Sequence, residues 1–61
     1  SEDKILHRLF EEGDDKTIVK VLHLIQYIDY SPFLKKIEKL TKHKNSKINS
    51  LAKKIIKKDF T

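Results

Sequence analysis

The stretch Thr17-Ile-Val-Lys-Val-Leu-His-Leu-Ile-Gln-Tyr-Ile28 decides the fold of this chain. At about 100° per residue, six of its apolar side chains share one helical arc of roughly 160°, while Lys20, His23 and Tyr27 fall opposite. Strict alternation fails and the run is long for a strand, so the pattern predicts a helix. Because this arc is wider than a two-helix seam needs, we expect the helix to contact more than one neighbour. The inward positions are Ile18, Val21, Leu22, Leu24, Ile25 and Ile28.

Three further segments show helical spacing of apolar residues, over residues 1–12, 32–41 and about 46–60. With the central helix they predict an all-α fold, a small bundle forming one domain over residues 1–61. The inward positions of these three segments are, in order, Ile5, Leu6, Leu9 and Phe10; Phe33, Leu34, Ile37 and Leu40; and Ile48, Leu51, Ala52, Ile55, Ile56 and Phe60.

Capping residues mark the boundaries in the first half of the chain. Ser1 or Asp3 suits the start of the first helix. Gly13 is expected to end that helix in the left-handed conformation that glycine adopts readily. Asp14 or Asp15 is then expected to cap the central helix.

Similar signals stand in the second half. Ser31 as the capping residue, with Pro32 at the first helical position, predicts the start of the third helix. Asn45 or Ser46 is expected to begin the fourth.

Composition limits the function. A chain of 61 residues has no room for a catalytic cleft with supporting shells, and the absence of cysteine excludes disulfides and thiolate metal sites. The chain also lacks methionine, so we expect it to be a piece of a longer protein. No apolar run approaches the roughly 20 residues of a membrane span.

No constellation of residues predicts catalysis or a cofactor. No pair among His7, His23 and His43 has the i, i+4 spacing of a helical zinc site, and the first two are expected to face solvent. The acidic residues Glu11, Glu12, Asp14 and Asp15 are expected to form a solvated, capping turn. There is no nucleophile elbow or glycine-rich phosphate loop. We therefore expect a protein that is not an enzyme and holds neither metal nor cofactor.

Charge is distributed unevenly. Residues 1–30 hold four basic and seven acidic side chains, a net −3, whereas residues 31–61 hold ten lysines and two acids, a net +8. The second half should attract anions. Arginine is absent from that half, so bidentate reading of bases is not available and lysines offer only phosphate attraction. A solvated lysine face, contact with a nucleic acid backbone, and a membrane-surface or calmodulin-target helix all remain open.

A pattern over residues 39–60 combines a leucine, a Lys-His-Lys-Asn turn and a helix with regularly spaced apolar residues, at Leu40, Lys42, His43, Lys44, Asn45, Ile48, Leu51, Ala52, Lys54, Ile55 and Ile56. On these positions, residues 39–60 resemble the last third of the TFIIS N-terminal domain, the family of transcription elongation factor IIS, Mediator subunit 26, elongin A and the LEDGF integrase-binding domain. The central helix resembles the family's leucine- and isoleucine-rich helix. The chain departs from the family pattern at Asp59, where a tryptophan usually falls, and at Ser31-Pro32-Phe33.

The resemblance implies a right-handed bundle of four to five helices that acts as a monomeric docking module in the nucleus. Such modules bind short disordered peptides that carry acidic residues near a phenylalanine, over the interhelical loops at one end of the bundle. Here those loops are the turns 12–16 and 42–46. The candidate partner-binding residues are Lys42, His43, Lys44, Asn45, Ser46, Gly13, Asp14 and Lys16.

Replacing an inward residue of the central helix tests its phase. Leu22→Ala is expected to lower the free energy of unfolding by roughly 2–5 kcal/mol, because a buried leucine is lost. Lys20→Ala, on the opposite side, should change it by less than about 0.5 kcal/mol. Chemical denaturation followed by circular dichroism measures both. Equal losses from the two variants would show that the phase is wrong.

Overall fold

The structure, a computed structural model, describes the backbone of residues 2–59 and the side chains of residues 4–59. Within this range the chain forms four α-helices and one short 3-10 helix, with no strand, which confirms the all-α prediction. The elements are α1 (Glu2–Glu12), α2 (Asp15–Ile25), η1 (Ser31–Phe33), α3 (Leu34–Leu40) and α4 (Ser46–Asp59).

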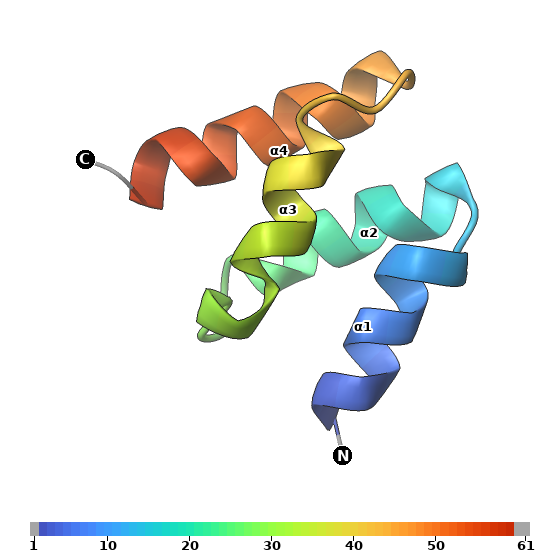
Figure 1. Cartoon of the computed structure of the whole chain (residues 1–61), viewed down its shortest axis with the longest axis vertical. Coiled ribbons are helices and arrows are strands. Elements are labelled where there is room, and N and C mark those ends of the chain that lie inside the picture. The colour runs from blue at the N-terminus through green and yellow to red at the C-terminus, as the bar shows by residue number, and fades with distance from the viewer. Residues whose placement is uncertain (1, 60–61) are drawn as a thin grey trace.

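Helix α2 lies between α1 and α4 and contacts both, as its wide apolar arc predicts, and α3 packs on α4 (Figure 1). The beginning of α1 and the end of α4 lie far apart (Figure 1). The radius of gyration of 10.5 Å equals the value of about 10.5 Å expected for a compact chain of this length. The described helices therefore pack into a compact bundle.

Each helix contributes to one hydrophobic core. Leu22, Ile37, Ile48 and Ala52 are completely inaccessible to solvent, so α2, α3 and α4 meet at the centre. Half-buried apolar side chains, among them Leu6, Leu9, Leu40, Leu51 and Ile56, pack against this centre, and Leu34 is also half-buried. The predicted Phe60 lies outside the described residues. The buried apolar residues are Phe10, Ile18, Val21, Leu22, Ile25, Phe33, Ile37, Ile48, Ala52 and Ile55.

Three predicted core positions are wrong. Leu24 is 67% exposed, Ile28 is 50% exposed, and Ile5 on α1 is 63% exposed. Leu24 lies about 120° from Ile18 on the helical wheel, beyond the strip that α1 and α4 cover. Helix α2 ends at Ile25, and the N–H of Ile28 donates to the carbonyl of Ile25 at 3.2 Å in a tighter turn, so Ile28 leaves the predicted arc.

The third segment starts differently from the prediction. Ser31 is the first residue of η1 and not a capping residue. Instead, Asp29 Oδ1 accepts hydrogen bonds from the hydroxyl of Ser31 at 2.7 Å and from its N–H at 3.1 Å. These bonds hold the pKa of Asp29 below its usual range. The α-helical part of this segment then begins only at Leu34.

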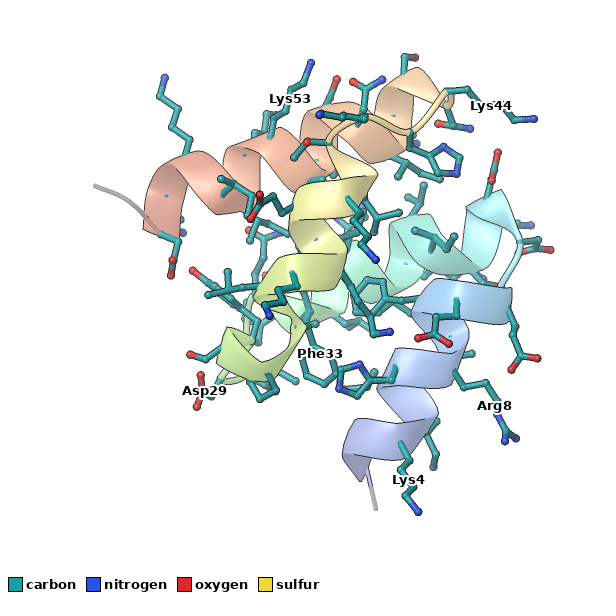
Figure 2. All side chains as sticks on the ribbon, viewed as in Figure 1. Lys4, Arg8, Asp29, Phe33, Lys44 and Lys53 are labelled. Carbon is teal, nitrogen blue, oxygen red and sulfur yellow. The ribbon has the colours of Figure 1, made fainter. Side chains whose placement is uncertain are left out.

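Phe33 joins this segment to α1. It is 1% exposed, and its ring centroid lies 4.5 Å from that of His7 and 5.9 Å from that of Phe10 (Figure 2). The prediction that His7 faces solvent is therefore wrong: the ring is half-buried against Phe33, and its Nδ1 is buried without a hydrogen-bond partner in the described structure. His23 is exposed, as predicted.

Two boundary predictions in the first half differ in part from the structure. Helix α1 begins at Glu2, so Asp3 lies within it, and Ser1 lies outside the described residues. Gly13 follows α1 directly, but its φ is not positive, so the left-handed conformation predicted for it is wrong. Glycine is needed at this position because a side chain has no room there. A Cβ at Gly13 would lie 2.5 Å from the Leu9 carbonyl oxygen and 3.1 Å from Thr17 Cγ2.

Gly13→Ala tests this close approach. An added methyl group ordinarily stabilises a compatible site by about 0.4–1 kcal/mol through the unfolded chain. Here the contact with backbone oxygen must be relieved by moving α1 against α2, so we expect a net loss of about 1–3 kcal/mol. Thermal denaturation measures the change, with Ser50→Ala on the exposed surface of α4 as the control substitution. A Gly13→Ala variant as stable as the parent would contradict the close packing.

Candidate functional site

The two turns predicted to bind a partner lie together at one end of the bundle. Asp15, the first residue of α2, accepts a hydrogen bond at Oδ2 from Asn45 Nδ2 at 3.1 Å. Its Oδ1 lies 3.8 Å from His43 Nε2. These contacts join residues about 30 positions apart in the sequence, and they hold the first turn of α2 beside the first turn of α4.

Asn45 organises the second turn. Its side-chain Oδ1 accepts hydrogen bonds from the N–H groups of Lys47 at 2.9 Å and Ile48 at 3.1 Å, so it caps α4, the first of the two predicted alternatives. Its own N–H donates to Nδ1 of His43 at 3.0 Å. Asn49 Nδ2 donates to the carbonyl oxygen of His43 at 3.0 Å.

These bonds give His43 a structural role. An Nδ1 that accepts from the backbone carries no proton in neutral imidazole, so the proton is on Nε2, directed at Asp15. The ring is half-buried, with both nitrogens oriented towards groups of this chain. His43 therefore holds the turn in place for the residues around it.

The start of α2 is capped by Asp14. Its Oδ1 accepts the N–H of Thr17 at 2.9 Å, which confirms one of the two predicted caps. Hydrogen bonds from the side chain and the backbone of Thr17 hold the pKa of Asp14 below its usual range. Asp14 is thus a carboxylate at neutral pH, and its Oδ1 is already hydrogen-bonded to the helix that it caps.

A groove of about 450 Å³ runs between the first turns of α2 and α4. Val19 is half-buried there and is the apolar residue of its lining, whereas Lys16, Lys20 and Lys47 are exposed cations. The dipoles of both helices place partial positive charge at this end of the bundle. The groove is lined by Asp15, Lys16, Val19, Lys20, Asn45 and Lys47.

The structure divides the predicted site residues. Lys16 and Asn45 line the groove, while Gly13 and Asp14 shape the turn before α2. Ser46 is the exposed first residue of α4. Sequence reasoning missed Val19, Lys20 and Lys47 as groove residues. The i, i+3, i+4 spacing of the residues from Lys16 to Lys20 places them on one face of α2, and that spacing was the available signal.

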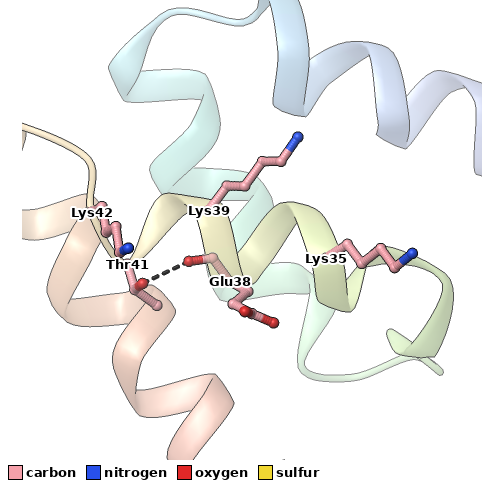
Figure 3. Close-up of a pocket in the computed structure, with 5 residues that line it drawn as sticks. All are labelled: Lys35, Glu38, Lys39, Thr41 and Lys42. Carbon is pink, nitrogen blue, oxygen red and sulfur yellow. Dashed lines mark hydrogen bonds between the residues drawn. The ribbon is translucent and has the colours of Figure 1, made fainter.

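Lys42 and Lys44 lie elsewhere. Lys44 is exposed and projects outward from the turn (Figure 2). Lys42 lines a second, separate hollow of about 530 Å³ on α3 (Figure 3). That hollow, which we name the α3 lysine face, is lined by Lys35, Glu38, Lys39, Thr41 and Lys42.

Comparison of the chain with models of known protein families, with curated proteins and with solved structures found no significant match. In the described part of the chain, no group of three or more histidine, cysteine, aspartate or glutamate side chains is placed to hold a metal ion. None of the described helices has the length and apolarity to cross a membrane.

The capping role of Asn45 gives a direct test of the site's architecture. Asn45→Ala removes the cap of α4 and the bond to Asp15, and we expect a loss of about 1–2 kcal/mol in the free energy of unfolding. Asn45→Ser keeps a capping oxygen and should recover most of that loss. Urea denaturation of the three proteins measures both changes. Equal losses from alanine and serine would show that Asn45 does not cap α4.

Proposed function

We propose that this chain is a protein-interaction module that binds short disordered peptides in the groove between α2 and α4. The peptides would carry acidic residues near a phenylalanine. The observation that supports this most is the composition of the groove, where three lysines surround one half-buried apolar residue, Val19. A cationic rim around an apolar floor complements an acidic peptide with an aromatic anchor.

The groove offers a different contact to each part of such a peptide. Peptide carboxylates would meet the ammonium groups of Lys16 and Lys47 on opposite sides of the groove. A phenyl ring would lie against Val19 and the aliphatic stems of the lysines. The groove also contains one anion, Asp15, whose Oδ2 already accepts a hydrogen bond from Asn45 and whose Oδ1 lies 3.8 Å from His43 Nε2.

The proposal also defines the class of protein, a binding module with weak and rapidly exchanging partners. Ordering a disordered peptide costs free energy, so we expect micromolar affinity and fast exchange. We propose a monomer without catalytic activity that contributes binding alone. The resemblance to the TFIIS N-terminal domain supports a role in transcription elongation or chromatin, and hence the nucleus.

Charge reversal in the groove tests the proposal. Changing Lys16 and Lys47 together to glutamate should weaken binding of a synthetic peptide with one phenylalanine among aspartates at least tenfold, because the rim becomes anionic. Lys54 and Lys57, which are exposed on α4 and do not line the groove, serve as the matched pair for the same substitution. Isothermal titration calorimetry measures affinity, and far-ultraviolet circular dichroism checks the fold.

Two outcomes would contradict the proposal. Equal losses from the two lysine pairs would mean that net charge, and not the groove, attracts the peptide. Unchanged affinity after replacement of the peptide's phenylalanine by serine would mean that Val19 does not form an anchor site.

A further inference from the structure

Helix α3 presents a row of lysines away from the core. Lys35, Lys39 and Lys42 follow i, i+4, i+7 spacing, are exposed, and border the same hollow of the α3 lysine face (Figure 3). Lys42 stands in the turn directly after α3, where its N–H donates to the carbonyl of Lys39 at 3.1 Å. The row therefore continues past the end of the helix.

None of these three lysines forms an ion pair in the described part of the chain, although Lys39 also interacts electrostatically with the Glu11 carboxylate. The neighbouring Lys36 of α3, in contrast, forms an ion pair with Glu11 of α1 and lowers the pKa of that carboxyl. Glu38 is the acid in the lining of the α3 lysine face, which leaves three cations against one anion. Thr41 donates its hydroxyl to the carbonyl of Glu38 at 2.6 Å, so this hydroxyl is engaged by the backbone.

We infer that the α3 lysine face binds the phosphate backbone of nucleic acid without reading its sequence. The row from Lys35 to Lys42 spans about 10 Å at 1.5 Å per residue. One strand of a duplex carries about three phosphates over that length of its axis. Lysine attracts phosphate as a point charge, and this face has no arginine that could read base edges.

The lining disfavours the other polyanionic partners. An interfacial membrane helix inserts an apolar face into the lipid. In this segment Phe33 and Ile37 are 1% and 0% exposed in the core. Leu34 and Leu40 are half-buried, so no fully exposed apolar face is left among the described residues of the segment. An acidic peptide with an aromatic anchor needs an apolar floor. The groove has one in Val19, whereas every residue lining the α3 lysine face is polar or charged.

The test measures the salt dependence of binding to two short DNA duplexes of unrelated sequence by fluorescence anisotropy. Three phosphate contacts predict a slope of about −2.7 in log K against log salt. Replacing Lys35 and Lys39 by glutamine should reduce the slope to about −0.9 and weaken binding at least tenfold at low salt. Lys54→Gln with Lys57→Gln is the matched control, with a smaller loss expected. Glu38→Gln should tighten binding, because the lining loses its anion.

Several results would overturn the inference. One is an equal loss of affinity for duplex DNA from the Lys35 and Lys39 substitutions and from the Lys54 and Lys57 substitutions. The others are unchanged or weaker binding by Glu38→Gln, and a preference for one duplex sequence. Competition by polyglutamate or by anionic vesicles as strong as that by unlabelled duplex would reassign the face to another polyanion. Circular dichroism of each variant checks that the fold is retained. Peptide binding in the groove is measured separately, and we expect these substitutions to leave it unchanged.

Discussion

The fold depends on the burial of one narrow strip of α2 between α1 and α4. Ile18, Val21, Leu22 and Ile25 form this strip, and none is more than 6% exposed. Fully burying one aliphatic side chain contributes about 1.5–3 kcal/mol, so four such residues supply a gross contribution comparable to the whole net stability of a small domain. Helix α3 does not depend on this strip alone, because Phe33 ties its segment to the aromatic rings of α1.

The position of α2 also determines where the groove forms on the surface. Once the strip is buried, the first turn of α2 stands beside the first turn of α4, and the bond between Asp15 and Asn45 joins them. The groove follows from that junction. Helix α3 packs on α4 with its apolar side inward, so Lys35 and Lys39 are left facing solvent. The proposed peptide site and the proposed phosphate site thus have different linings and can be altered separately.

Periodicity and capping chemistry predict the helices and the buried strip, because both depend on residues that lie within a few positions of one another in the sequence. Asp14 and Asn45 cap helices as their side chains favour. Periodicity describes a helix and not its neighbours, which is why it predicts Leu24 to be in the core although none of the described helices covers this residue. Spacing within α2 indicates that Lys16, Val19 and Lys20 share one face, but the groove also needs Lys47 of α4, and only the tertiary structure places Lys47 beside that face.

Native-state hydrogen exchange measured by nuclear magnetic resonance tests the central role of α2 most directly. If the strip organises the fold, the amides of Leu22 and Ile25 exchange only through global unfolding and are the slowest in the chain. The amide of Arg8, in the exposed part of α1, should exchange faster through local opening. Exchange of Leu22 and Ile25 as fast as that of Arg8 would contradict the account, since α2 would then open without unfolding the rest.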